Sequence, residues 1–534
     1  MNKSKPERAN RENAFFKSSS RIYNQAIEAT HNILSEITKN KEWQSAGYNI
    51  LKDNNLLSPS TIEEKERALL ILQQHTATIA KAIDTRIAIP TLIQSTEEYY
   101  YGNNTYKTDA PWLGTAIKLS IAEIWNNSAA ETTKSASISK LKKIIYLSAA
   151  QQQLEHEISI SFALKCNPIE IRKNGIFDPA PERSDIVDSW NKMTILRGAG
   201  QRTVHQSLDI VWKSPIDFLY SVHLVLSGKS PKSIELFKDS IFSEVGNNKD
   251  FWLPIALRLI LLISIKDIKE AVSDKYYGLV LFEEFPIYAD NYEIPKNISP
   301  DDIQRETFKL FWRHDWKSTQ RNSLKSNLLV ERPAIRVDNK TFATSMLNIV
   351  DSTNSFIEAS IFGNIEITGA KVDESAFQKF ISQPFEDRIC KKIINIGWQA
   401  SQVKSNGYWK SKGIILESYN NLTMPGEIDV LAVHPSNKFC LIIECKILDA
   451  PYSKEKLRNI KRKLGPEDSE QFHSKLYRKI NWLKTVPYFF GTVILGVIIV
   501  DRGAFLSDGS QNRVLDEDDL IPMLEGADKI ISDA

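Results

Sequence analysis

Apolar residues recur at helical spacing over the first third of the chain. Between Ile22 and Ile33 they lie four, three and four positions apart, which places them on one face of a helix. Residues 58–67 supply cap residues and early acids ahead of an apolar run, which is typical of a helix start. A further helix is expected over residues 137–164.

The pattern changes twice further along the chain. Proline and glycine interrupt residues 166–200, and helical spacing returns over residues 205–330. Residues 332–344 hold two short β-rich runs around a polar turn, which predicts a hairpin, and strands then alternate with helices to the end. These changes divide the chain into a helical domain (1–165), a second helical region (166–330), a hairpin and linker (331–370) and an α/β domain (371–534).

Two apolar runs are candidates for a membrane span, and both are too short for one. The run from Phe251 to Ile265 contains a proline and an arginine, and the run from Tyr488 to Val500 has 13 residues. A helix needs about 20 apolar residues to cross a bilayer. We therefore predict a buried helix for the first run, a buried strand for the second, and no membrane partner.

Composition narrows the class of protein. The chain is 42% hydrophobic and 25% charged, which is typical of a globular protein and excludes a mainly disordered one. The net charge of +2 excludes a basic nucleic-acid coat, so any polyanion site must come from local charge asymmetry. Four cysteines without paired spacing and a charged N-terminus without an apolar signal region fit a cytoplasmic protein.

Two common motifs fail on inspection. Gly228-Lys229-Ser230 resembles the end of a phosphate-binding loop, but His223 stands where the loop requires glycine. His156-Glu157 could open a zinc-protease helix, but Ile160 stands where the second histidine is required. Neither nucleotide binding nor zinc proteolysis is therefore expected.

The informative stretch is residues 426–446. Two β-rich runs flank the polar turn around residues 435–437, which predicts an antiparallel hairpin. Since alternate residues of a strand share a face, Glu444 and Lys446 point the same way, and Asp429 can meet Glu444 across the hairpin. Charges that converge beside apolar strands are costly to bury unpaired, so the arrangement needs a reason.

A divalent cation supplies that reason. Two carboxylates, a main-chain carbonyl and waters form a hard oxygen site suited to Mg²⁺ or Mn²⁺. Asp429 and Glu444 are the candidate metal ligands, and Lys446 could neutralise charge at an attacked phosphate or orient a water. Glu427 could be a second ligand on the Asp429 face, or could support the site or face solvent.

These residues resemble the PD-(D/E)xK nuclease superfamily, which has the restriction-endonuclease-like fold. Asp429, Glu444 and Lys446 carry the resemblance, and the Gly-Glu-Ile-Asp and Glu-Cys-Lys spellings are closest to the Mrr-like and nuclease-related (NERD) groups. The resemblance covers roughly residues 370–534. It implies an αβββαβ domain with a mixed central sheet, and a glutamate on the preceding helix that assists the metal, a role that falls on Glu386.

The segment after the hairpin fits a nucleic-acid partner. Residues 453–484 read as helix and hold ten positive and four negative side chains, and residues 491–500 read as a core strand. Gln471 and Lys475 could reach the site or a phosphate, with a solvated polar face as the equal alternative. A set of positive residues could contact a nucleic-acid backbone, with a solvated helix face as the alternative: Lys454, Lys456, Arg458, Lys461, Arg462 and Lys463.

The sequence therefore predicts an α + α/β protein, with a large helical N-terminal region followed by a nuclease domain. The resemblance implies Mg²⁺-dependent phosphodiester hydrolysis. We expect a DNA endonuclease of prokaryotic anti-phage defence, with the helical region as sensor, substrate selector or partner platform. Two alternatives stay open: a nucleic-acid-binding scaffold with an inactive nuclease-like domain, and an RNA-directed nuclease. A homodimer or a regulatory partner protein would fit either nuclease.

Overall fold

The structure is a computed structural model of the 534-residue chain. The residues that it describes are 21–37, 47–101, 113–127, 138–163, 168–171, 214–217, 219–220, 236, 249–272, 277–283, 299–312, 332–338, 341–361, 378–419, 422–448, 454–465, 472–507 and 514–532. The chain forms two compact units. Residues 1–179 and 196–372 make up the first unit, and residues 180–195 and 373–534 make up the second.

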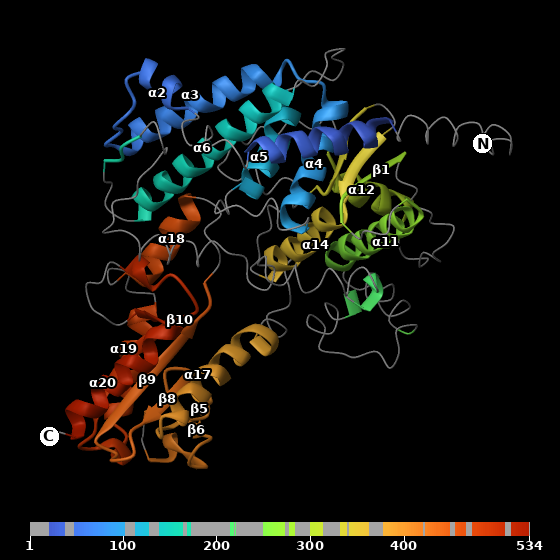
Figure 1. Ribbon diagram of the computed structural model, residues 1–534. Coiled ribbons are helices and arrows are strands. Elements are labelled where there is room, and N and C mark those ends of the chain that lie inside the picture. The colour runs from blue at the N-terminus through green and yellow to red at the C-terminus, as the bar shows by residue number, and fades with distance from the viewer. Residues whose placement is uncertain are drawn as a thin grey trace. The chain divides into compact units, whose positions relative to one another are not determined.

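The first unit is mostly helical, as predicted (Figure 1). Its described helices include residues 21–37, α2 (Tyr48–Asp53), α3 (Ile62–Ala80), α4 (Thr85–Tyr101), α5 (Leu113–Asn127), α6 (Ile138–Ala163), α11 (Lys249–Val272), α12 (Pro300–Leu310) and α14 (Met346–Ile361). Helix α3 starts where the sequence predicts, because Thr61 and Glu64 cap each other: each backbone amide donates to the other side chain at 3.2 Å. Helix α6 confirms the helix predicted over residues 137–164.

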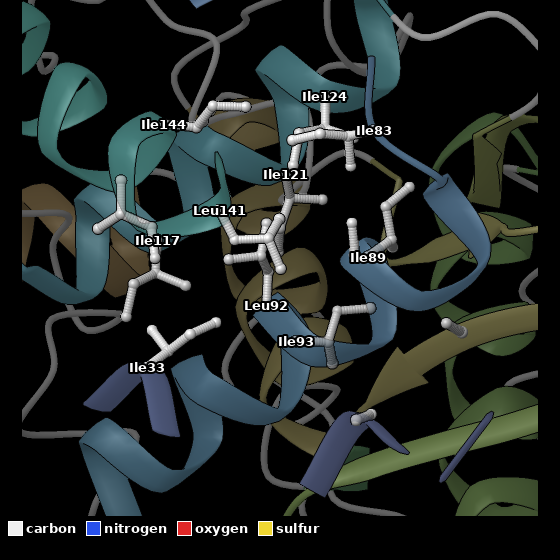
Figure 2. Close-up of a cluster of buried hydrophobic side chains, with 14 of the residues drawn as sticks. Ile33, Ile83, Ile89, Leu92, Ile93, Ile117, Ile121, Ile124, Leu141 and Ile144 are labelled. Carbon is white, nitrogen blue, oxygen red and sulfur yellow. The ribbon is translucent and has the colours of Figure 1, made fainter. Parts of the chain in front are cut away.

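Branched aliphatic side chains fill the core between the N-terminal helices. Figure 2 shows this cluster, in which residues of α4, α5 and α6 point toward one another. Ile89, Ile117 and Ile144 are all fully buried. Helix α11 is buried along the apolar run that the sequence assigned to a buried helix. No helix in the described ranges is long and apolar enough to cross a membrane.

A four-stranded sheet completes the first unit, in the order β1-β4-β3-β2. Its strands are β1 (Leu279–Glu283), β2 (Phe311–Trp312), β3 (Ala334–Arg336) and β4 (Thr341–Ser345). Strands β3 and β4 are antiparallel and form the predicted hairpin. Strand β1 pairs with β4, which places the hairpin within the first unit, and neither β1 nor β2 was foreseen in the region predicted as helical.

A carboxyl group lies buried inside this unit without full compensation. Glu97 on α4 is 0% exposed and accepts from the Gly278 amide at 3.2 Å, while its Oε1 has no hydrogen-bond partner. Burial raises the pKa of Glu97 to about 7, against hydrogen bonds from Ser345 and Gly278 and the charges of Lys118 and Lys269, which favour the ionised form. The folded protein therefore holds this proton more tightly than the unfolded chain does.

Substituting this residue should change how stability depends on pH. Because the folded-state pKa of Glu97 is raised above its ordinary 4.5, ionisation costs the folded state increasing free energy as the pH rises from 4.5 to about 7. Relative to wild type, Glu97→Gln is therefore expected to gain up to about 3 kcal/mol in unfolding free energy between about pH 4 and about pH 8. Urea unfolding at both pH values measures this gain, and parallel pH profiles would contradict it.

The second unit alternates helices and strands, as predicted for residues 371–534. After a short π-helix (Gln378–Ser382), its elements are α17 (Gln383–Asn395), β5 (Gln399–Val403), β6 (Tyr408–Trp409), β7 (Ile414–Ile415), β8 (Ile428–Val433), β9 (Phe439–Lys446), α18 (Lys454–Leu464), α19 (Phe472–Lys484), β10 (Val493–Val500), β11 (Val514–Asp516) and α20 (Leu520–Ser532).

These strands form one mixed sheet of seven, in the order β11-β10-β9-β8-β5-β6-β7. Strands β8 and β9 are antiparallel, and β10 runs parallel to β9 (Figure 1). Helices α17 and α20 cover one face of the sheet, where Phe385 and Leu524 join a core that includes Ile443 and Val497. Helix α19 packs on the other face, against Gly496 of β10.

Two segments of this unit hold more than the sequence predicts. The segment 453–484, predicted as helix, holds two helices, α18 and α19, with residues 466–471 outside the described part. The acidic run of residues 516–519 leads into α20, and Asp516 stands at the N-cap position of a short 3₁₀ turn there. The same run also ends β11, which pairs with β10, and Glu517 accepts from the Arg388 guanidinium at 2.8 and 2.9 Å.

Candidate active site

The predicted hairpin is present, and its register brings the two acidic residues together. Val430 of β8 lies opposite Ile443 of β9, so the next pair toward the open end is Asp429 and Glu444. The Cys445 amide donates to Asp429 Oδ2 at 2.8 Å, which fixes the orientation of that carboxylate. The Cys445 side chain points to the opposite face, into the core under α17, as the strand period requires.

Lys446 joins the two carboxylates. Its Nζ lies 3.2 Å from Asp429 Oδ2 and 3.0 Å from Glu444 Oε2, so one ammonium group bridges both acids. Burial opposes the charge on Lys446, yet its pKa is raised above the ordinary value because the two carboxylates face it. Lys446 is therefore a fixed positive charge at any physiological pH.

The pKa values of the two acids are shifted in opposite directions. Burial raises the pKa of Asp429, and the facing charge of Lys446 opposes that rise. Glu444 is 2% exposed, but Lys446 and Lys479 outweigh its burial and hold its pKa below the ordinary value. Glu444 is thus the more firmly ionised of the two carboxylates.

Glu386 lies in the first turn of α17 and is buried, as its predicted role beside the site requires. Its Oε2 accepts from Gln402 Nε2 at 3.1 Å, and its Oε1 accepts from Gln378 Nε2 at 3.5 Å. Burial, followed by the charge of Asp429, raises the pKa of Glu386 to about 7. The charge of Asp429 therefore acts on Glu386, while the hydrogen bonds of Glu386 are made with Gln402 and Gln378.

Lys479 is a residue of this cluster that was not predicted from the sequence. It lies on α19, is 6% exposed and pairs with Glu444 Oε1. In the sequence, it was counted only among the positive charges of the basic segment 453–484. A signal was present, because Leu476, Ile480 and Leu483 put Lys479 on the apolar face of the helix, where a lysine is seldom found without a partner.

For the remaining candidates, the structure shows no contact with this cluster among the described side chains. Glu427 is exposed, and its Oε1 accepts from the Ser405 amide at 3.4 Å. Lys475 is exposed on α19, and Gln471 lies outside the described residues. Lys454 and Lys456 lie in α18, and their side chains are not among those that the structure describes. The other four predicted backbone contacts are Arg458, Arg462 and Lys463, which are exposed, and Lys461, which is half-buried.

The donor set fits a hard divalent cation in part. Among the described residues, no group of three or more His, Cys, Asp or Glu side chains is arranged to hold a metal. Asp429 and Glu444 offer two carboxylates that already share one positive charge, the Lys446 ammonium. Mg²⁺ is typically held by one or two carboxylates, with water and substrate phosphate in its other positions. Two acids are therefore enough for this ion.

Comparison with known proteins adds no relative. No protein-family model matches the chain, and no curated protein or solved structure matches it. Any assignment of function therefore depends on the residues of the site and their geometry.

Proposed function

We propose that the second unit is a Mg²⁺-dependent nuclease of the PD-(D/E)xK type, in its Mrr-like or NERD-like variety, and that it acts as a DNA endonuclease. One observation carries the proposal: Asp429, Glu444 and Lys446 meet at the open end of a two-stranded hairpin, with both carboxylates within 3.2 Å of the same ammonium. The helix before the hairpin and the basic helix after it support the same reading.

The roles follow from the contacts. Asp429 and Glu444 would hold the metal, which when bound polarises the phosphodiester and acidifies a water. Lys446 lies between them and can neutralise negative charge that develops on the attacked phosphate, or orient the attacking water. Glu386 would assist the metal from α17 and is itself oriented by Gln402 and Gln378.

Substrate selection must come from outside this cluster, because a phosphodiester site reads neither base nor sugar. Helix α18 buries Leu457, Ile460 and Leu464 and exposes cationic side chains on its other side, which suits contact with a phosphate backbone. We assign the first unit the role of sensor, substrate selector or partner platform. A place in anti-phage defence and a homodimer that cuts both strands complete the proposal.

Removing one positive side chain from α18 should weaken nucleic-acid binding, because one contact with the phosphate backbone is lost. Lys463→Gln is expected to lower the slope of log affinity against log salt by about 0.9, the value for one lost phosphate contact. Lys438→Gln removes one exposed charge at the turn of the hairpin, at the far end from Asp429 and Glu444, and serves as the matched control. Equal slopes for Lys463→Gln and wild type, from fluorescence anisotropy on a short duplex, would contradict this role for α18.

A substrate panel tests the proposed function. The wild type is incubated with duplex DNA, single-stranded DNA and RNA at one ionic strength, with Mg²⁺, Mn²⁺ or EDTA. We expect DNA cleavage that depends on the metal. Metal-dependent cleavage of RNA alone would replace DNA with RNA as the substrate, and binding without cleavage of any substrate would favour the scaffold alternative.

A further inference from the structure

Helix α19 brings an additional charge to the site. Three of its positive side chains, those of Lys475, Arg478 and Lys484, are exposed, whereas Lys479 is buried. Burying a lysine is unfavourable unless its charge is compensated. Among the described residues, the ion-pair partner of Lys479 is the carboxylate of Glu444.

Both oxygens of Glu444 are therefore engaged. Oε1 pairs with Lys479 of α19, and Oε2 pairs with Lys446 of the same strand at 3.0 Å. The carboxylate cannot rotate without breaking one of these two pairs. Lys446 also pairs with Asp429 at 3.2 Å. The contact from α19 therefore holds one end of a series of ion pairs that runs from Lys479 through Glu444 and Lys446 to Asp429.

A glycine allows α19 to come this close. A Cβ on Gly496 of β10 would lie 2.5 Å from Ile480 Cδ1 and 2.9 Å from Leu476 Cδ1, so these two α19 side chains pack directly on the strand backbone. Gly496 lies two residues before Ile498, and Ile498 pairs with Glu444. The close approach therefore occurs beside the acid that Lys479 contacts.

We propose that Lys479 is a positioning residue of the nuclease site: it holds Glu444 by Oε1 so that Oε2 faces Lys446 and Asp429. The inference depends on the proposed nuclease function and deepens it, because it assigns a role to a helix that the hairpin motif does not include. Lys479 acts through Glu444 and not on the substrate. Its loss should lower turnover and leave substrate affinity unchanged.

Steady-state kinetics of Lys479→Met test this role. The methionine keeps the length of the apolar stem and removes the charge. We expect kcat to fall about 10–100-fold, the usual cost of losing a group that orients a metal ligand, with KM changed less than about twofold. Lys484→Met removes an exposed lysine from the same helix and should behave as wild type. If Lys479→Met does not fold, Lys479→Gln, which keeps a hydrogen-bond donor, carries the same comparison.

Two outcomes would overturn the inference. If Lys479→Met melts at a lower temperature but keeps its kcat, Lys479 serves only stability. If KM rises and kcat is retained, Lys479 contacts the substrate and does not position Glu444.

A double-mutant cycle on unfolding tests the contact without any activity. Lys479→Met and Glu444→Gln should each lower the urea midpoint, because each leaves a buried charge with fewer partners. The double variant should lose less than the two shifts together. Additive shifts alongside metal-dependent cleavage would overturn the inference and leave the proposed function intact. Coupled shifts in a protein that cleaves nothing would contradict the proposed function, and with it the role of Lys479 in turnover.

Discussion

Asp429→Asn is expected to lower metal-dependent cleavage by about 10²–10³-fold, the scale of losing one preorganised transition-state contact, because it removes a charged ligand of the metal. The asparagine keeps the size of the side chain, and its carbonyl oxygen can still accept from the Cys445 amide, which donates to Asp429 Oδ2 at 2.8 Å. What it loses is the negative charge shared with Lys446. The variant therefore separates charge from packing, and initial rates of plasmid nicking measure the difference.

The matched control removes an exposed acid of the same unit. Asp519 lies in the turn before α20, and the Asp519→Asn variant should cleave at the wild-type rate. Thermal melting should show that both variants are folded. An Asp429→Asn enzyme that is folded and as fast as wild type would show that this carboxylate takes no part in catalysis.

Gly496→Val should both destabilise the second unit and reduce activity. Its Cβ would fall 2.5 Å from Ile480 Cδ1 and 2.9 Å from Leu476 Cγ, separations that real contacts do not reach, so these α19 side chains or the helix itself must shift. Overpacking of this kind costs about 1–3 kcal/mol of unfolding free energy. We expect the shift to disturb the pair of Lys479 with Glu444 and kcat to fall by up to about tenfold, the lower end of the effect of losing the lysine itself. Urea unfolding and steady-state kinetics measure the two effects.

A second glycine provides the comparison for this variant. Gly526 lies in α20, and a Cβ there would have no atom within 4 Å. Gly526→Ala should therefore keep full activity and gain about 0.5–1 kcal/mol of unfolding free energy, because alanine has a higher helix propensity than glycine. If Gly496→Val is as stable and active as wild type, the close packing of α19 is not needed for the site.

The core of the site could be predicted because its signals are local. The positions of Asp429, Glu444 and Lys446 follow from the two-residue period of strands and from the polar turn between two apolar runs. Those features fix the register, and the register fixes which side chains meet. Glu386 was a weaker prediction, since its place depends on how α17 packs on the sheet, and the structure couples it electrostatically to Asp429.

Other features depend on contacts between distant parts of the chain and could not be predicted in this way. Lys479 meets Glu444 over 35 positions, through the packing of α19 at Gly496. Strands β2 and β3 have two and three residues, too few to show a period, and exist through pairing with their neighbours. Strand β11 ends in an acidic run that leads into α20, and it exists through its pairing with β10, which the local sequence does not show.

The central claim is that Lys446 and its two carboxylates form a metal-dependent nuclease site. Cleavage of supercoiled plasmid by wild type and Lys446→Met, each with Mg²⁺ and with EDTA, tests it most directly. The account predicts nicked or linear DNA only for wild type with Mg²⁺. Equal cleavage by the two proteins, or cleavage by wild type in EDTA, would contradict the site outright.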